Sequence, residues 1–287
     1  MNTPTDPHAG QAVAADPAPR APAAYASHPL FAPIAPLLAR FTDARLPDAA
    51  TLSALLAETA GAVTSGGGQP VRFVPPPDEA PAYEAHIHAR GEVPTRIDDW
   101  HDFFNALAWC AWPRTKAACN ALHLREIAAR RAAGASGRGA RRDALTQFDE
   151  CGIVVVSADP SILALLAAHE WEAVFWQRRD ALAASTRFMV FGHGSWDQLR
   201  APFFGLCAKA VHRVVDAGWL ALPEAARQAE IDAWLAAWLE ATFDTLTPRT
   251  LHPLPLLGIP GVTPANACAA YYRDTRQFRP RRGAVRG

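Results

Sequence analysis

The chain has 287 residues, half of them hydrophobic, and its 28 basic residues balance 28 acidic ones. This balance argues against a dedicated nucleic-acid-binding protein, which usually carries a basic excess, and no uninterrupted apolar run is long enough to suggest a membrane span. The hydrophobic content suffices for one large domain or two small ones.

The chain begins with a segment that has few side chains to bury in a hydrophobic core. Residues 1–27 are dominated by Ala and Pro, a composition typical of disorder. The spacing of Leu52, Leu55 and Leu56 predicts the first helix. Three consecutive glycines at 66–68 then predict a flexible loop.

Two short strands are predicted next, at 71–74 and 83–88. Three prolines at 75–77 exclude a tight two-residue turn between them. In the second strand His86 and His88 would face the same side, a spacing that occurs at metal sites. No further ligand is attached to this pair in the sequence, so we expect a solvent-facing strand edge.

The most informative segment runs from Trp100 to Leu107, with the sequence WHDFFNAL. Its pattern predicts a buried helix that is capped by Asp98 or Asp99 and ends near Cys110. Polar groups are costly to bury, so the imidazole, carboxylate and carboxamide of this helix need partners.

The elements that follow show no regular alternation of strand and helix. Pro113 fits the first turn of a second helix, which reaches about Arg131. The remaining predicted elements are, in chain order, a basic Gly-rich loop at 132–141, a β-hairpin of 145–148 and 153–157 with its turn at 149–152, a helix from Asp159-Pro160 through Trp176, a strand at 187–191, helices near 195–202, 205–217 and 223–243, and an irregular segment from Thr247. Together they predict an α+β fold, a predominantly helical single domain with short antiparallel β-hairpins. We expect this domain to cover 28–280 and a flexible tail to follow at 281–287.

Four side chains are predicted to form a catalytic group. On the central helix His101 and Asn105 share a face, and Asp102 lies on an adjacent one. Imidazole and carboxylate can act as general base and orienting partner, or can bind a divalent ion. His193 lies between two glycines at a predicted strand end and could reach into the same cleft. The alternative is that His101 or Asp102 caps a neighbouring backbone end while the aromatics form plain core.

Three basic side chains are predicted to bind substrate. Arg114 and Lys116 lie near a helix N-terminus, where free backbone N–H groups suit an anion. Arg142 belongs to a basic, glycine-rich segment that could contact phosphates. Ordinary helix-end charges and a solvated loop are the alternative.

Asp149 and Glu150 form an acidic pair at the predicted hairpin turn. Carboxylates in such a position hold Mg²⁺ or Mn²⁺ in metal-dependent phosphoesterases, so a divalent metal site here is a hypothesis. Asp is also an ordinary first residue of a Gly-containing turn, and for Asp149 this explanation is favoured.

The five cysteines point to a reducing compartment. Their number is odd and none has C-x-x-C spacing, which argues against a disulfide framework and a zinc ribbon. Buried free thiols in a cytoplasmic protein are the expectation. The N-terminus shows no basic region followed by an apolar run, so no secretory signal is expected.

Several motifs together resemble one protein family. These are WHDFFNAL at 100–107, PRTK at 113–116, RD at 142–143, LT at 145–146, FDE at 148–150 with Gly152, FGH at 191–193, PLPLLGIPG at 253–261, and the stretch 272–280 that ends in FRP. Over roughly residues 70–280 the chain resembles domain-of-unknown-function family 3025. The resemblance implies a bacterial, cytoplasmic setting and supplies no activity, substrate or cofactor.

Two hypotheses of function remain open. In the first, the chain is an enzyme that performs hydrolysis or group transfer on a small substrate, which could be anionic, with a divalent metal as a possible cofactor. In the second, it is a non-catalytic ligand-binding or protein-interaction domain, and its buried polar residues stabilise the core. The first requires His101 and His193 to lie within reach of one ligand in a cleft. The sequence leaves the oligomeric state open.

Overall fold

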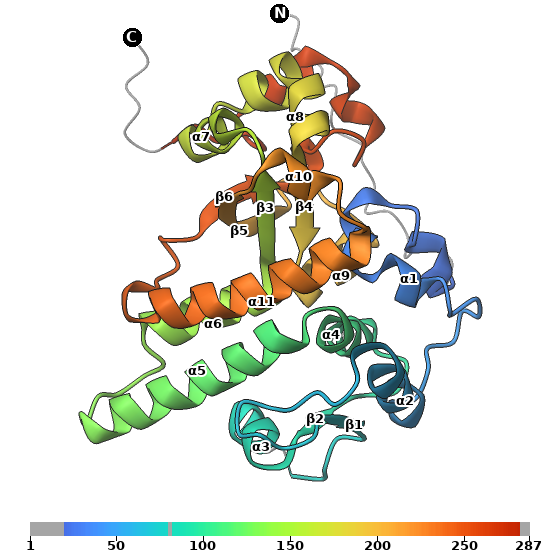
Figure 1. Ribbon diagram of the computed structural model, residues 1–287, viewed down its shortest axis with the longest axis vertical. Coiled ribbons are helices and arrows are strands. Elements are labelled where there is room, and N and C mark those ends of the chain that lie inside the picture. Colours follow the sequence, from blue (N-terminus) through green and yellow to red (C-terminus); the bar gives the residue numbers. More distant parts are fainter. Residues whose placement is uncertain (1–19, 80–81, 282–287) are drawn as a thin grey trace, which may run out of the picture.

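Helical residues make up 56% and strand residues 12% of the part of the chain that the computed structural model describes, residues 20–79 and 82–281. The predicted α+β class with a predominance of helices is confirmed. Figure 1 shows a four-stranded sheet in the upper half of the molecule and a group of helices below it.

The elements lie along the chain as follows. The α-helices are α1 (Ala35–Leu38), α2 (Ala49–Ala60), α3 (Tyr83–Arg90), α4 (Trp100–Ala111), α5 (Pro113–Ala132), α6 (Ala140–Cys151), α7 (Pro160–Ala168), α8 (Arg179–Ser185), α9 (His193–Leu199), α10 (Ala217–Leu220) and α11 (Glu224–Thr242). The strands are β1 (Arg72–Val74), β2 (Glu92–Pro94), β3 (Gly152–Ser157), β4 (Thr186–Val190), β5 (Cys207–Val214) and β6 (His252–Pro255). A π-helical turn covers Ala173–Gln177, and short 3₁₀ turns cover Pro22–Tyr25, Pro29–Ile34, Phe243–Thr245, Leu256–Gly258, Pro264–Ala267 and Ala269–Arg273.

The four-stranded sheet has the order β4-β3-β5-β6. β3 is antiparallel to β4 and parallel to β5, while β6 is antiparallel to β5. All six residues of β3 are buried, as expected for a central strand with the continuous apolar run Ile153 to Val156.

The lower half is built on α4 and α5. α4 packs against α2 and α9, and α5 packs against α3, α6 and α11. The two long helices α5 and α11 run side by side across the middle of the molecule (Figure 1). The small parallel pair β1–β2 lies at the lower edge.

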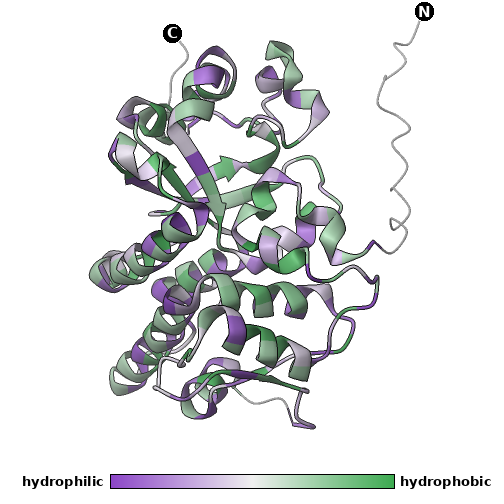
Figure 2. Cartoon of the chain, turned by 45° about the vertical axis from the view of Figure 1, so that its right-hand side comes forward, coloured by the Kyte–Doolittle hydropathy of each residue, from purple (hydrophilic) through white to green (hydrophobic). Residues whose placement is uncertain are grey.

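One contiguous hydrophobic core links both halves, from Tyr25 to Phe278. Hydrophobic residues prevail on the central helices in Figure 2. Trp109, Trp112 and Trp196 are among the largest side chains that are fully enclosed. The aromatic run of the central helix is therefore core, as its spacing predicted.

The predicted β-hairpin of 145–148 and 153–157 and the predicted strand at 83–88 are wrong. Residues 145–148 belong to α6, because Leu145 and Phe148 are buried at a spacing of three, which fits a helix as well as a short strand. Residues 83–88 form α3, which ends at Gly91 in a left-handed conformation. The tight-turn antiparallel arrangement is replaced by β1–β2 and β3–β5 pairs that are parallel.

Two further boundaries differ from the prediction. The predicted helix at 205–217 is β5, whose alternating burial follows a strand. The helix that starts at Pro160 ends at Ala168, where His169 adopts a left-handed conformation, instead of continuing through Trp176.

The predicted disordered segment 1–27 is too long at its C-terminal end. Residues 22–25 form a 3₁₀ turn and Tyr25 is buried against Phe31. Residues 1–19 and 282–287, which hold the rest of the two predicted terminal segments, lie outside the described residues.

The five cysteines form no disulfide with one another, but the expectation that all are buried is wrong, since Cys207 and Cys268 are exposed. In the described ranges, no helix combines the length and apolarity that a bilayer crossing requires.

Candidate active site

Strand pairing brings two distant segments to one edge of the sheet. Ile153 lies opposite Val190, so the start of β3 lies beside the end of β4. Glu150 is in the last turn of α6, directly before β3. His193 is the first residue of α9, directly after β4. The antiparallel register therefore places Glu150 and His193 next to each other.

The close approach of these segments requires glycine at two positions. A Cβ at Gly192 would lie 2.4 Å from the backbone nitrogen of Gly152, and a Cβ at Gly194 would lie 2.5 Å from Oε2 of Glu150. Real Cβ contacts are longer. A side chain at Gly192 would therefore push against the backbone of Cys151 and Gly152, whereas a side chain at Gly194 would first displace the carboxylate of Glu150. The glycines that flank His193 allow its segment to pack directly against Glu150.

His101 reaches the same edge from the first turn of α4. Asp99 caps this helix and accepts a hydrogen bond from the backbone nitrogen of Asp102 at 3.0 Å, as predicted. Trp112, directly after α4, donates from Nε1 to the carbonyl oxygen of Val190 at 3.1 Å. This bond anchors the C-terminal end of α4 to the end of β4, and the packing of α4 against α9 places His101 beside His193.

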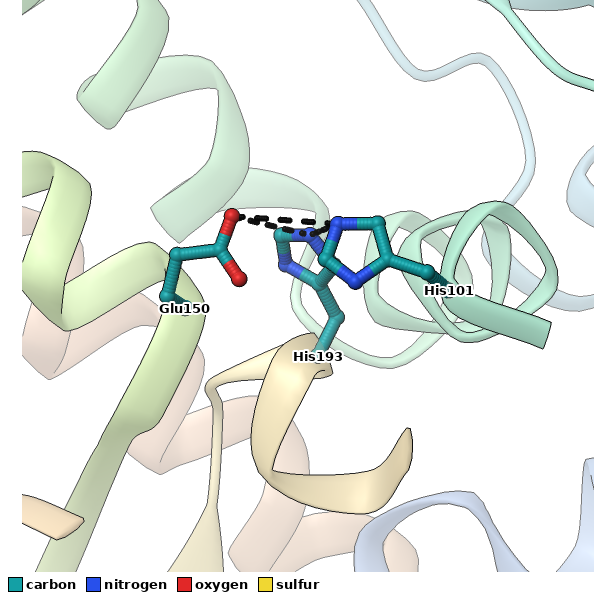
Figure 3. A group of neighbouring side chains, drawn as sticks. All are labelled: His101, Glu150 and His193. Atoms are coloured by element: carbon teal, nitrogen blue, oxygen red, sulfur yellow. Dashed lines mark hydrogen bonds and ion pairs between the residues drawn. The ribbon is translucent and has the colours of Figure 1, made fainter. Parts of the chain in front are cut away.

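The three side chains converge on one point, each from a different helix (Figure 3). Nε2 of His101 lies 3.1 Å from Nε2 of His193, and Oε1 of Glu150 lies 3.8 Å from each of these nitrogens. The side chains of His101 and Glu150 are 37% and 45% exposed, so solvent and ligands can reach the group, whereas His193 is buried.

Polar groups lie on the other side of the His193 ring, although its buried Nδ1 makes no hydrogen bond among the described residues. Its Nδ1 lies 3.7 Å from Oδ2 of Asp149, whose Oδ1 accepts a 2.6 Å hydrogen bond from Nζ of Lys116. Lys116 also donates to Oδ1 of Asn105 at 2.9 Å, and Asn105 donates to the hydroxyl of Tyr83. A carboxylate on this side favours the tautomer with the proton on Nδ1, which leaves the lone pair of Nε2 facing His101 and Glu150.

Burial sets the charge states along this chain of contacts. Burial lowers the pKa of His193 to about 3, with Lys116 and His101 acting in the same direction and Asp149 acting against them. Burial alone would raise the pKa of Asp149, but the charge and hydrogen bond of Lys116 hold it below its ordinary value. His193 is therefore neutral at neutral pH, which is the form that binds metals.

The triad of His101, Glu150 and His193 lines a cavity of about 460 Å³. Most residues of its wall carry polar side chains, among them Tyr83, Glu84, Arg96, Asp102, Asn105, His123, Arg138, Arg142, Thr146 and Asp149. A cavity of this volume suits a small molecule.

Two carboxyl groups of this wall ionise less readily than usual. Burial raises the pKa of Glu84, although the hydrogen bond from Asn120 at 2.8 Å opposes this. Burial, assisted by Asp149, also raises the pKa of Glu150 against the effect of His101. A raised pKa keeps a carboxyl group protonated to higher pH than usual, which suits a group that donates a proton.

Asp102 lines the cavity but both of its oxygens are occupied. They accept hydrogen bonds from the backbone nitrogen and the guanidinium of Arg96 at 2.8 to 2.9 Å. Burial opposes its ionisation, yet Arg96 holds the pKa of Asp102 below its ordinary value. The structure therefore shows Asp102 fixing the segment before α4, without a contact to either histidine.

The N-terminus of α5 does not offer the free backbone N–H groups on which the predicted anion site relied. The backbone nitrogens of Arg114 and Thr115 already donate to the carboxylate of Asp232, at 3.0 and 2.9 Å. Arg114 is exposed and is not among the residues lining the cavity. Lys116 is buried behind the cavity wall, where it holds Asp149, and Arg142 is the member of this predicted group that lines the cavity.

The acidic pair is split between two positions. Asp149 and Glu150 are consecutive in α6, so they point in different directions. Glu150 joins the two histidines, whereas Asp149 faces Nδ1 of His193 and Lys116. The metal-ligating atoms that gather within 4.8 Å of one another belong to His101, Glu150 and His193.

The sequence prediction missed the contribution of α3. Tyr83 and Glu84 reach the cavity because 83–90 is a helix, not a strand. The signal that could have revealed this helix is Gly91, since glycine directly after a polar segment often ends a helix. His86 and His88, which suggested a strand, are not on the cavity wall.

The family's sequence profile, described as "Protein of unknown function (DUF3025)", matches residues 71–282. The chain belongs to this family. The matched range contains every residue of the triad and of the cavity wall. No curated protein and no solved structure matches the chain.

Proposed function

We propose that the chain is a metal-dependent enzyme, a hydrolase or group transferase acting on a small molecule. In this proposal a divalent transition metal is bound by Nε2 of His101, Nε2 of His193 and the carboxylate of Glu150. The observation that carries it is the convergence of these three atoms, at 3.1, 3.8 and 3.8 Å, on the wall of a cavity.

The distances suit a metal after small movements. Two nitrogen ligands at about 2.1 Å from a tetrahedral ion lie roughly 3.4 Å apart. The imidazoles are slightly closer than this, and Glu150 must approach by a few tenths of an ångström. Its partly exposed side chain has the freedom to do so. Two imidazoles and one carboxylate favour Zn²⁺, Mn²⁺, Fe²⁺ or Co²⁺ over Mg²⁺ and Ca²⁺, which prefer oxygen ligands.

Three protein ligands leave coordination positions for water and substrate. A metal bound in this way activates water at neutral pH and polarises a substrate oxygen. Glu84 on the same wall can hold or deliver a proton, because burial keeps its pKa above the usual range. The arginines of the wall can stabilise negative charge that develops on the substrate. These groups are the ones that hydrolysis and group transfer use, and they support this reaction class.

Metal analysis with matched variants tests the proposal. We expect about one equivalent of metal in the purified or Zn²⁺-reconstituted protein, and an affinity at least about 100-fold lower in His101→Ala and Glu150→Gln. His252→Ala and Glu240→Gln are the controls, because both residues lie outside the cavity.

An activity assay complements the metal analysis. Metal-dependent hydrolysis of chromogenic carboxylic or phosphate esters should be lost in His101→Ala and kept in the controls. Protein that binds none of Zn²⁺, Mn²⁺ or Co²⁺ would contradict the proposal, and metal binding without turnover would favour a binding role.

We further propose a cytoplasmic setting, which the five unpaired cysteines support.

A further inference from the structure

Arg142 differs from its neighbours in having unused hydrogen-bond donors. Arg141 is paired with Glu126 and with the carbonyl oxygen of Asp244. Arg138 bonds the hydroxyl of Thr146 and lies 3.8 Å from Asp143. Among the described residues, the buried Nε of Arg142 has no hydrogen-bond partner and no carboxylate oxygen lies within 4.0 Å of its guanidinium.

A buried donor without an acceptor costs free energy, so such a group in a cavity wall points to a ligand. The guanidinium of Arg142 lines the same cavity as the triad. Its planar fork matches the oxygens of a carboxylate or phosphate group, to which it can donate two parallel hydrogen bonds. Both kinds of ligand carry a compact anionic group with two or more oxygens.

Helix geometry separates this guanidinium from the triad. Arg142, Thr146 and Glu150 are spaced by four residues in α6 and all three line the cavity. The rise of an α-helix places Arg142 and Glu150 about 12 Å apart along the axis. The Cα–Cβ bonds of both residues tilt toward the N-terminus of the helix, so this tilt leaves the axial separation unchanged.

We propose that Arg142 forms an anion-binding subsite two helical turns from Glu150, and that the substrate is an elongated small molecule with a terminal carboxylate or phosphate group. The reacting group of this substrate lies at the triad and its anionic end lies on Arg142. The part of this inference that places the reacting group at the triad rests on the proposed function.

Metal-chelating probes of two kinds test the subsite in the Zn²⁺-loaded protein. A hydroxamic acid with a plain alkyl chain engages the metal alone. The monohydroxamates of linear dicarboxylic acids, and their analogues with a terminal phosphonate, add an anion at increasing distances. We expect the best-fitting anionic probe to bind about 10- to 100-fold more tightly than the alkyl probe of equal length, because a charged hydrogen-bonded pair is formed. Preference for carboxylate over phosphonate, or the reverse, identifies the natural group.

Arg142→Gln should abolish this advantage and leave the affinity for the alkyl probe unchanged. The variant breaks no hydrogen bond of the described residues, so its thermal unfolding should match that of the native chain. Arg131→Gln is the matched control, since Arg131 is exposed and outside the cavity but carries the same charge. An anionic advantage that persists in Arg142→Gln, or that is absent from the native chain, would overturn the inference.

Failure of the metal proposal gives a different pattern. In that case the alkyl hydroxamate would not bind the native chain at all. Titration of the metal-free protein with inorganic phosphate and with acetate then tests the subsite by itself. Binding of either anion that is weakened in Arg142→Gln and kept in Arg131→Gln supports the subsite, and equal binding by all three proteins contradicts it.

Discussion

Thr115 and Lys116 are neighbours in α5 but belong to two different buried polar clusters. Thr115 meets Asp232 of α11, whose carboxylate accepts from the backbone nitrogens of Arg114 and Thr115 and from the hydroxyl of Thr115. Lys116 faces the other way, toward Asp149 and the triad. The first cluster pairs its donors and acceptors among themselves, whereas in the second the lone pairs of three side chains converge on one point.

This difference separates a structural cluster from a candidate site. Trp112, at the N-cap position of α5, makes no side-chain cap, so Asp232 supplies from α11 the acceptor that a local residue would normally provide. In that cluster the two backbone donors and the hydroxyl all meet the carboxylate of Asp232. In the triad, by contrast, one imidazole can donate to the other, and the remaining lone pairs face each other beside a cavity.

The largest expected effect on folding is at Asp232. Asp232→Ala removes the cap of α5 and leaves two backbone donors without an acceptor, while the hydroxyl of Thr115 keeps the backbone carbonyl oxygen of residue 232. We expect the free energy of unfolding to fall by about 2–4 kcal/mol, which urea denaturation measures. Zn²⁺ affinity of the folded protein should be unchanged. A loss of less than about 1 kcal/mol would mean that the cluster does not hold α5 in place.

A second prediction concerns the carboxylate behind His193. Asp149→Asn keeps the shape of the side chain but removes the charge that favours the Nδ1–H tautomer. We expect Zn²⁺ affinity to fall about 10- to 100-fold, the usual effect of losing a partner of a ligating histidine. Isothermal titration with Asp197→Asn, on the surface end of α9, as control measures this. If Asp149→Asn bound zinc like the native chain, Asp149 would not orient the ligand.

The pH dependence of stability distinguishes the clusters further. Folded His193 has a pKa of about 3, whereas in the unfolded chain its pKa is close to 6.5. Between these values the unfolded state binds a proton that the folded state does not, so the free energy of unfolding falls as pH falls from 6.5 toward 3. Between these pKa values His193 changes the free energy of unfolding by up to about 1.4 kcal/mol per pH unit. Above pH 6.5 the histidine is neutral in both states, so it no longer destabilises the folded state.

Urea unfolding of the metal-free protein between about pH 5 and about pH 7 checks this slope. His193→Gln should show a shallower dependence than the native chain. His88→Gln is the comparison, since His88 is partly exposed in α3 and outside the cavity. Equal slopes for the native chain and His193→Gln would show that His193 is not held neutral by burial.

The sequence predicted local structure well where caps and periodicity agree. Asp99, Pro113 and the Asp159-Pro160 pair correctly marked the starts of α4, α5 and α7. It failed where a short segment fits two periods, as in 145–148, or where alternating histidines lie in a helix, as in α3. Short amphipathic segments acquire one conformation from their tertiary contacts.

The sequence indicated which residues could belong to the site, but not that they meet. His101, His193 and Glu150 were each singled out by their local context, but their meeting depends on the register between β3 and β4. Long-range pairing is not encoded in any one segment. The close packing of Gly194 on Glu150 shows the same point, because both glycines around His193 are visible in the sequence while the partner that requires them is not.

The smallest expected effect is at Asp102, which lies on the cavity wall and was predicted to be catalytic. Its carboxylate is fully engaged by Arg96, whose side chain is 58% exposed, so solvent screens much of the ion pair. We expect Asp102→Ala to lower the free energy of unfolding by about 1 kcal/mol, mainly through the lost bond to the backbone nitrogen of Arg96. Zn²⁺ affinity and metal-dependent turnover should change by less than about threefold, which corresponds to well under 1 kcal/mol.

Arg96→Ala should produce the same small loss of stability if the pair acts as one unit. A large fall in turnover in Asp102→Ala, with stability and zinc affinity intact, would instead return Asp102 to the catalytic group, as the helical pattern of 100–107 first suggested.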